Sequence, residues 1–205
     1  MALVLPRLYA IVDPLDTGRA PQALAAALLD GGARLLQLRL KDAPARVLLE
    51  EARAIVALVR AHGAMLIVND RADVAAAAGA DGVHLGQDDL PVAAARAVLP
   101  PGTLVGVSTH DLAQARAAER DGADYLGVGP MFATTTKADA LAPRGLALLA
   151  AVRAAVRCPL VAIGGITPET APAVLAAGAD AVAMIAALVR PADPAAAVRA
   201  LLERL

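Results

Sequence analysis

The chain has 205 residues, of which 58% are hydrophobic and 1% aromatic, and its formal net charge is −1. This length supports one sizeable core but is short for two ordinary domains. The balanced charge and scarce aromatics argue against nucleic-acid binding, and charged residues interrupt every apolar run before it could span a bilayer. The single cysteine excludes an internal disulfide, so the cytoplasm is the expected compartment.

Eight short apolar segments predict buried strands. In chain order they are LYAIVD (8–13), GARLLQLR (32–39), MLIVND (65–70), GADGVHLG (79–86), LVGVST (104–109), GADYLGVG (122–129), LVAIGG (160–165) and GADAVAMI (178–185). Near-continuous apolar runs are typical of parallel strands that are buried on both faces. The stretch before the first strand has no basic region ahead of its apolar residues, so it is interpreted as a lead-in and not as a signal peptide.

Ala-rich stretches with helical spacing lie between and after these strands. In chain order they cover residues 21–32, 43–63, 73–79, 91–100, 111–122, 143–156, 168–178 and 193–205. The glycine before several of the strands suits the left-handed turn that ends a helix. Eight strands, each followed by a helix, predict a single (β/α)8 TIM barrel over residues 1–205, with an open doubly wound sheet as the alternative.

Active sites in this fold lie at the carboxyl ends of the strands, and polar residues gather there. Arg39, Lys41 and Lys137 suit a polyanion, because they donate charge-assisted hydrogen bonds to phosphate oxygens. Asp70 and Asp89 follow neighbouring strands and suit Mg²⁺, which takes one or two carboxylates and completes its shell with water and phosphate. The sequence therefore indicates a diphosphate with Mg²⁺. A surface salt-bridge cluster is the alternative interpretation.

Asp88, beside Asp89, is interpreted as a solvated neighbour or as a cap for the helix that starts near Pro91. Gly164-Gly165 and Ile185-Ala186 follow the seventh and eighth strands, where this fold commonly binds phosphate through backbone N–H groups. A tight turn that requires glycine would explain the first pair equally. The hydroxyl-rich segment TTTK (134–137) could hold phosphate or act as a lid.

Together these residues resemble the thiamine phosphate synthase family over essentially the whole chain. The matching pieces are LYAIVD, QLRLKD, LIVNDRADVAAAAGADGVHLGQDDLP, GVSTH, GADYLGVGPMF, TTTK, AIGGIT and GADAVAMIAAL. The elements NDR, HLGQDD and TTTK are specific in this order and spacing, whereas a lone GG or QxRxK would not be.

The resemblance implies a Mg²⁺-dependent coupling of 4-amino-2-methyl-5-hydroxymethylpyrimidine diphosphate with 4-methyl-5-hydroxyethylthiazole phosphate, or its carboxylated form, to give thiamine phosphate and pyrophosphate. By resemblance, the pyrimidine diphosphate site comprises Gln37, Arg39, Lys41, Asn69, Ser108 and Lys137. Of these, the catalytic residues would be Arg39, Lys41, Ser108 and Lys137. The Mg²⁺ ligands would be Asp70 and Asp89, and the thiazole phosphate site would comprise Thr134, Thr136, Gly165, Ile185 and Ala186.

The partners implied are small-molecule substrates, with neither nucleic acid nor a membrane. The sequence does not define the oligomeric state, and a homo-oligomer is compatible with it. Two positions depart from the family pattern: Leu40 stands where an acid is common, and Ala186 stands where Ser is common.

Three other functions stay open from the sequence. A thiazole tautomerase of the same fold could use His110 as an acid–base catalyst, although it would typically lack the NDR, second-aspartate and TxTK set. A non-catalytic binder of thiamine precursors is the second alternative. Another phosphate-binding barrel isomerase is the third, for which Gly164-Gly165 alone would suffice.

Overall fold

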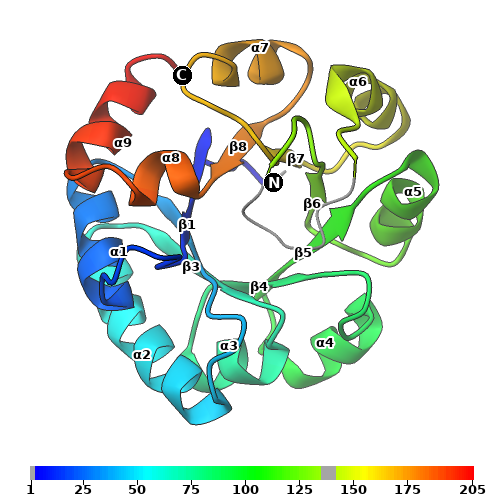
Figure 1. Ribbon diagram of the computed structural model, residues 1–205. Coiled ribbons are helices and arrows are strands. Elements are labelled where there is room, and N and C mark those ends of the chain that lie inside the picture. Colours follow the sequence, from blue (N-terminus) through cyan, green and yellow to red (C-terminus); the bar gives the residue numbers. More distant parts are fainter. Residues whose placement is uncertain (1–2, 135–141) are drawn as a thin grey trace.

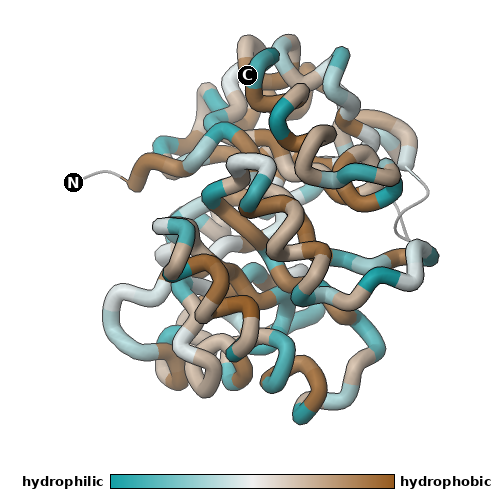
Figure 2. Tube along the Cα trace, turned by 90° about the vertical axis from the view of Figure 1, so that its left-hand side faces the viewer, coloured by the Kyte–Doolittle hydropathy of each residue, from teal (hydrophilic) through white to brown (hydrophobic). Residues whose placement is uncertain are grey.

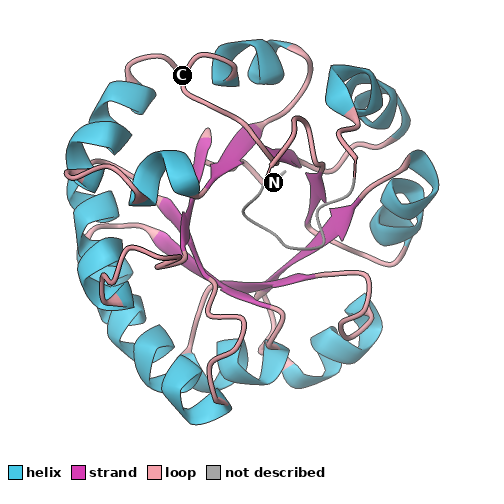
Figure 3. Cartoon of the chain, viewed as in Figure 1, coloured by secondary structure: helices cyan, strands magenta, loops and turns pink. Residues whose placement is uncertain are grey.

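The computed structural model describes residues 3–134 and 142–205, and these form a closed barrel of parallel strands ringed by helices (Figures 1 and 3). The strands are β1 (Leu8–Val12), β2 (Leu35–Leu38), β3 (Met65–Asn69), β4 (Gly82–Leu85), β5 (Leu104–Thr109), β6 (Tyr125–Val128), β7 (Leu160–Ile163) and β8 (Ala181–Met184). They pair in sequence order, and β8 returns to β1 with Val182 opposite Leu8. The predicted (β/α)8 barrel is confirmed, and the open sheet is wrong.

The helices of the described residues lie outside this ring. They are α1 (Pro21–Asp30), α2 (Ala45–Ala61), α3 (Ala72–Ala78), α4 (Val92–Val98), α5 (Leu112–Arg120), α6 (Gly145–Ala155), α7 (Ala171–Ala176), α8 (Ala186–Val189) and α9 (Pro194–Leu202). Figure 2 shows hydrophobic and hydrophilic residues mixed along the helices, as expected where one face packs on the barrel. The short α8 was not predicted. Nowhere in residues 3–134 and 142–205 does a helix reach the length and apolarity needed to cross a membrane.

Strand β1 illustrates why the apolar runs form barrel strands. All five of its residues are buried. Tyr9 and Ile11 line the barrel interior, and the residues that alternate with them face the surrounding helices, because successive side chains of a strand point to opposite faces. Both faces of β1 are therefore buried, which is what its uninterrupted run of apolar residues predicts.

The repeated Gly-Ala-Asp segments connect neighbouring strands at the amino end of the barrel. Asp81 accepts a hydrogen bond from the N–H of Leu66 at 2.8 Å, so it joins the start of β4 to β3. Equivalent bonds, from Val105 to Asp124 at 2.7 Å and from Leu160 to Asp180 at 2.8 Å, join β5 to β6 and β7 to β8. The glycines of these segments have positive φ, as predicted. The amino end of the barrel thus serves stability, which leaves the carboxyl end for chemistry.

Candidate active site

Five of the predicted site residues line a single cavity at the carboxyl end of the barrel. They are Gln37, Arg39, Asn69, Ser108 and Ile185. They come from β2, β3, β5 and the segments that follow β2 and β8, so only closure of the barrel brings them together. The cavity wall therefore combines amide, guanidinium and hydroxyl groups with apolar side chains, which is the usual composition of a small-molecule site.

Arg39 is held by a carboxylate that sequence reasoning left without a role. Its Nη1 donates to Oδ2 of Asp13 at 2.5 Å, and both side chains are nearly buried. The other oxygen of Asp13 accepts the N–H of Leu15 at 3.0 Å, which fixes the carboxylate at the end of β1. A guanidinium has five donors, so the pair orients Arg39 and leaves further N–H groups for an anion in the cavity.

The two predicted metal ligands follow adjacent strands. Asn69 of β3 lies opposite His84 of β4, and the N–H of Asp70 donates to the carbonyl of His84 at 2.8 Å. Asp70 has a φ of +64°, a conformation that costs energy for a residue other than glycine and is often found at functional sites. Asp89 Oδ2 accepts the N–H of Gly86 at 2.6 Å. Both carboxylates thus belong to one edge of the barrel, beside but not among the residues that line the cavity.

The remaining polar residues of this edge are more exposed. Lys41 follows β2 with an exposed side chain, and Asp88 is exposed beside Asp89. Asp88 does not cap the next helix: α4 has Pro91 at its N-cap and no side-chain cap. That interpretation is wrong, and the solvated one is confirmed. Among the described residues, no three His, Cys, Asp or Glu side chains gather as a metal site. The Mg²⁺ site at Asp70 and Asp89 stays a prediction.

The glycine pair after β7 packs closely against the loop after β6. Gly164 and Gly165 have φ values of +99° and +63°. A Cβ on Gly164 would lie 2.6 Å from Cβ of Pro130, and one on Gly165 would lie 2.4 Å from the carbonyl oxygen of Ala133. Conformation and close approach both require glycine here, so the turn interpretation is sufficient, and phosphate binding at Gly165 stays a proposal.

The other predicted thiazole phosphate residues are distributed around this turn. Ile185 is the N-cap of α8 and Ala186 is its first residue, directly after β8. Thr134 lies just beyond the loop that contacts Gly165 and is partly buried. Thr136 and Lys137 lie outside the described residues, so the structure does not test their predicted roles.

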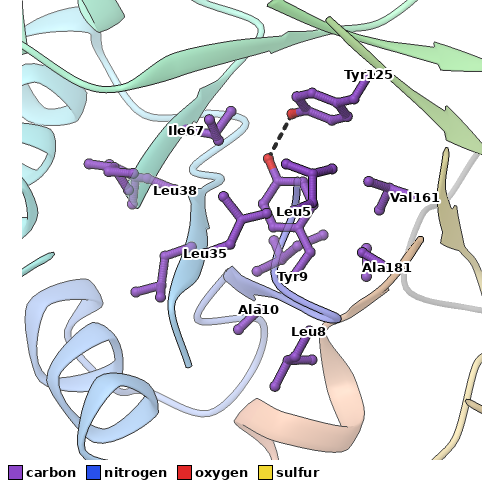
Figure 4. Close-up of a cluster of buried hydrophobic side chains, with 14 of the residues drawn as sticks. Leu5, Leu8, Tyr9, Ala10, Leu35, Leu38, Ile67, Tyr125, Val161 and Ala181 are labelled. Carbon is purple, nitrogen blue, oxygen red and sulfur yellow. Dashed lines mark hydrogen bonds between the residues drawn. The ribbon is translucent and has the colours of Figure 1, made fainter. Parts of the chain in front are cut away.

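Sequence reasoning missed a chain of hydrogen-bonded side chains along the cavity wall, in which every member except Tyr125 lines the cavity. Gln37 Nε2 donates to the Tyr9 hydroxyl at 2.9 Å, and the hydroxyls of Tyr9 and Tyr125 are 3.0 Å apart (Figure 4). Tyr125 reaches His84 Nδ1 at 3.1 Å, and His84 Nε2 reaches Ser108 Oγ at 2.9 Å. Burial raises the pKa of both tyrosines above 10, so both are neutral phenols at physiological pH. The sequence carried one signal for this chain of side chains. Of its three aromatic residues, the two tyrosines both lie inside strands.

His110 joins the end of β5 to the loop after β6. Its Nδ1 is 2.7 Å from the carbonyl oxygen of Gly129, and its backbone N–H donates to Gln114 Oε1 at 2.8 Å. A carbonyl only accepts, so Nδ1 must carry the proton. This contact gives His110 a structural role that the sequence did not indicate.

Comparison with known proteins identifies the family. The family model described as thiamine monophosphate synthase matches residues 8–188. The chain belongs to the thiamine monophosphate synthase family. A thiamine-phosphate synthase of Moorella thermoacetica is 52% identical over 197 residues, covering 96% of this chain and 94% of that protein. One of Chloroflexus aurantiacus is 53% identical over 196 residues, covering 95% and 90%.

Solved structures agree with membership of the thiamine monophosphate synthase family. A thiamine phosphate pyrophosphorylase of Pyrococcus furiosus superposes with a TM-score of 0.88 at 36% identity, covering 97% of this chain and 94% of that one. A 3-hexulose-6-phosphate synthase, 22% identical with a TM-score of 0.69, shares the barrel fold. The relatives of high identity are named as synthases, so the tautomerase and non-catalytic alternatives are not favoured.

Proposed function

We propose that the protein is a thiamine-phosphate synthase, a transferase that couples 4-amino-2-methyl-5-hydroxymethylpyrimidine diphosphate to 4-methyl-5-hydroxyethylthiazole phosphate. The observation that carries the proposal is the cavity itself, because Gln37, Arg39, Asn69 and Ser108 converge there in a chain about half identical to named synthases. The products are thiamine phosphate and pyrophosphate. The substrates are small molecules, and the expected compartment is the cytoplasm.

In the reaction, the bond between the pyrimidine methylene carbon and the diphosphate oxygen breaks, and pyrophosphate leaves with the electron pair. The aminopyrimidine ring stabilises the cation left on that carbon. The thiazole nitrogen then donates its lone pair to form the new C–N bond. No protein nucleophile is required. The protein places the two substrates in contact and stabilises the negative charge on the departing pyrophosphate.

The proposed roles of the residues follow from their positions. Arg39, oriented by Asp13, donates to the diphosphate, and the exposed side chain of Lys41 can turn toward the same group. The Ser108 hydroxyl and the Asn69 amide line the cavity and contribute neutral hydrogen bonds. Lys137 is proposed to complete the positive charge by resemblance.

Mg²⁺ is the proposed cofactor, held by Asp70 and Asp89. The residues fit this ion, because two partly buried carboxylates in the segments that follow adjacent strands supply the oxygen ligands that Mg²⁺ takes beside a phosphate. When bound, the ion would neutralise charge on the leaving pyrophosphate. At the opposite side, Gly165, Ile185 and Ala186 are proposed to hold the thiazole phosphate through backbone N–H groups, with Thr134 and Thr136 adding hydroxyls.

The test is a coupling assay with both substrates and Mg²⁺, in which thiamine phosphate is oxidised to fluorescent thiochrome. We expect product from the wild type, none without Mg²⁺, and a loss of at least about a hundredfold in Asp89→Asn. Asparagine keeps an oxygen that can accept the Gly86 N–H, so the loop should persist. The matched control is Asp88→Asn, which removes an exposed neighbouring charge and should retain most activity. No product from folded wild-type protein would contradict the proposed function.

A further inference from the structure

The hydrogen-bonded chain along the cavity wall connects two predicted substrate contacts that are not neighbours in the barrel. Gln37 is on β2 and Ser108 is on β5, and the chain passes between them through Tyr9 of β1, Tyr125 of β6 and His84 of β4. These five side chains, here called the interior chain, are separated by distances of 2.9, 3.0, 3.1 and 2.9 Å in that order. Each link is of ordinary hydrogen-bond length.

Packing fixes the rings of the interior chain. The rings of Tyr9 and Tyr125 meet edge to face with centroids 6.0 Å apart, and the His84 ring stacks on Tyr125 at 5.5 Å. A Cβ on Gly106 would lie 2.1 Å from Cζ of Tyr125, and one on Gly127 would lie 3.0 Å from Cε1 of His84. The two glycines leave just enough room for these rings, so the ring positions are set by the barrel wall.

The donor and the acceptor of each hydrogen bond in the interior chain can be assigned by starting from Gln37. The Gln37 Nε2 group only donates, so the Tyr9 oxygen accepts from it. Among the described residues, the other hydrogen-bond partner of the Tyr9 hydroxyl is the Tyr125 oxygen. A buried hydroxyl proton is almost always bonded, so Tyr9 donates to Tyr125. Tyr125, having accepted, gives its proton to His84 Nδ1. Because burial holds both phenols neutral, each has one proton to pass on. His84 then has an unprotonated Nδ1.

The consequence reaches the cavity at Ser108. A neutral imidazole with an unprotonated Nδ1 carries its proton on Nε2, and this N–H donates to Ser108 Oγ at 2.9 Å. The serine oxygen is then an acceptor toward His84, and its own O–H is directed elsewhere. Since Ser108 lines the cavity, that proton is available to a ligand oxygen there.

We propose that Tyr9, Tyr125 and His84 are positioning residues that hold Ser108 as a hydrogen-bond donor toward the diphosphate substrate. This inference rests on the proposed function for the identity of the acceptor. The orientation of the Gln37 amide sets the direction of the whole chain, so the contact that Gln37 makes and the contact that Ser108 makes are coupled across the barrel. A reversed amide would turn every link around and make Ser108 donate to His84 instead.

The deciding measurement is the tautomer of His84 in the substrate-free protein. Long-range ¹H–¹⁵N spectra of ¹⁵N-histidine-labelled protein at neutral pH report which ring nitrogen carries the proton. The protein has three histidines, and His110 serves as the internal reference for a neutral ring, because its Nδ1 faces a backbone carbonyl oxygen. His62 faces acceptors with both ring nitrogens, the Leu58 carbonyl with Nδ1 and the Asp30 carboxylate with Nε2. We expect His84, assigned with His84→Gln, to be protonated on Nε2 while His110 is protonated on Nδ1. An Nδ1-protonated His84 would overturn the proposal.

Two matched tyrosine variants separate positioning from structure. Tyr125→Phe removes the donor to His84 Nδ1, so we expect a mixture of His84 tautomers and a kcat about tenfold lower, with a smaller change in KM. Tyr9→Phe removes an equally buried hydroxyl but leaves Tyr125 able to donate to His84. We expect a similar loss of stability from Tyr9→Phe, but a smaller change of the His84 tautomer and a smaller loss of kcat, because the link from Tyr125 to His84 survives without the bond that fixes its direction.

Equal losses of kcat in the two variants, with an unchanged tautomer in both, would show that the tyrosines only stabilise the barrel, and would overturn the proposal. The tautomer spectra need no turnover, so they decide the direction of the interior chain even if the wild type makes no thiamine phosphate. Failure of the proposed function and failure of this inference are therefore distinguishable.

Discussion

At the scale of single residues, the ion pair of Asp13 and Arg39 shows how a site can depend on a side chain that never meets the substrate. The two groups are 2.5 Å apart and almost out of contact with water. A guanidinium left without its carboxylate in such a place would carry an uncompensated charge, which costs several kcal/mol when burial is complete. Asp13 therefore compensates the charge of Arg39, so that the barrel stays stable although its cavity contains a cation.

We expect Asp13→Asn to lower the free energy of unfolding by about 1–3 kcal/mol, because Arg39 keeps a neutral acceptor but loses its counter-charge. Pyrophosphate should then raise the melting temperature of Asp13→Asn more than that of the wild type, since an anion in the cavity replaces the missing charge. Thermal unfolding with and without pyrophosphate measures both effects.

The control for this variant is Asp16→Asn. Asp16 pairs with Arg190 at 3.5 Å on the exposed surface, where ion pairs contribute about 0–1 kcal/mol. It should change neither the stability nor the response to pyrophosphate appreciably. An Asp13→Asn protein that behaves like Asp16→Asn would mean that Arg39 does not depend on Asp13.

At the scale of elements, the contact between the turn after β7 and the loop after β6 joins two halves of the proposed thiazole phosphate site. The N–H groups of Met131 and Phe132 donate to the carbonyls of Ile163 and Gly164, both at 2.9 Å. These bonds extend the β6–β7 pairing beyond the strands. The position of the loop is therefore set by how closely Gly164 and Gly165 allow it to approach.

We expect Gly165→Ala to lower the free energy of unfolding by about 2–4 kcal/mol, adding the cost of overpacking to that of a positive φ. It should also raise the KM for the thiazole phosphate, because the loop must move away from the turn. Urea unfolding and steady-state kinetics with each substrate varied give the two values.

Gly18→Ala is the matched control for the backbone contribution. Gly18 has a φ of +69°, and no atom lies within 4 Å of the position that a Cβ would take there. The substitution should therefore cost only about 1 kcal/mol and leave both KM values unchanged. If Gly165→Ala cost no more than Gly18→Ala, the close approach of the loop would not constrain position 165.

The sequence predicted the elements well because their signals are local. Continuous apolar runs give strands, and a glycine before Ala-Asp gives the turn that ends a helix. The four-residue helix α8 was missed, because one turn of Ala186–Val189 has no periodicity to detect. The aspartates of the repeat were recognised as a pattern, but their bonds to the neighbouring strand were not, since pairing of strand starts depends on register.

At the scale of the whole molecule, closure of the barrel creates contacts that no local pattern encodes. Gln37 and Ser108 could be placed at strand ends from the sequence, and their convergence on one cavity followed from the fold. The interior chain could not be predicted, because Tyr9 meets Tyr125 only when strands far apart in the sequence face each other across the barrel. The ion pair of Asp13 and Arg39 depends in the same way on the pairing of β1 with β2.

Buried phenols predict how the whole protein responds to alkali. The pKa values of Tyr9 and Tyr125 are raised by burial above the ordinary value of 10.0, so the folded state keeps protons that the unfolded state releases. The two tyrosines should leave stability unchanged below about pH 10 and should lower it above that pH, by up to about 1.4 kcal/mol per pH unit for each. Burial also raises the pKa of the half-buried Cys158 thiol from 9.0 to about 12, so this group acts in the same direction but already from about pH 9.

Absorbance at 295 nm tests this directly, because the chain has two tyrosines and no tryptophan. We expect the tyrosinate signal to stay absent above pH 10 and to appear together with the loss of helical circular dichroism, whereas urea-unfolded protein should titrate near pH 10. Tyrosinate that appears near pH 10 while the helices persist would show that the phenols are open to solvent.

The fit between Gly106 and the Tyr125 ring also restricts the order in which these positions can evolve. Any larger residue at position 106 would place its Cβ 2.1 Å from the Tyr125 ring. Gly106 therefore cannot be replaced while Tyr125 remains. Replacing the tyrosine first opens the space but breaks the link to His84. Every single-step path away from this pair therefore passes through a weaker intermediate, and the two positions are expected to persist or change together in a lineage.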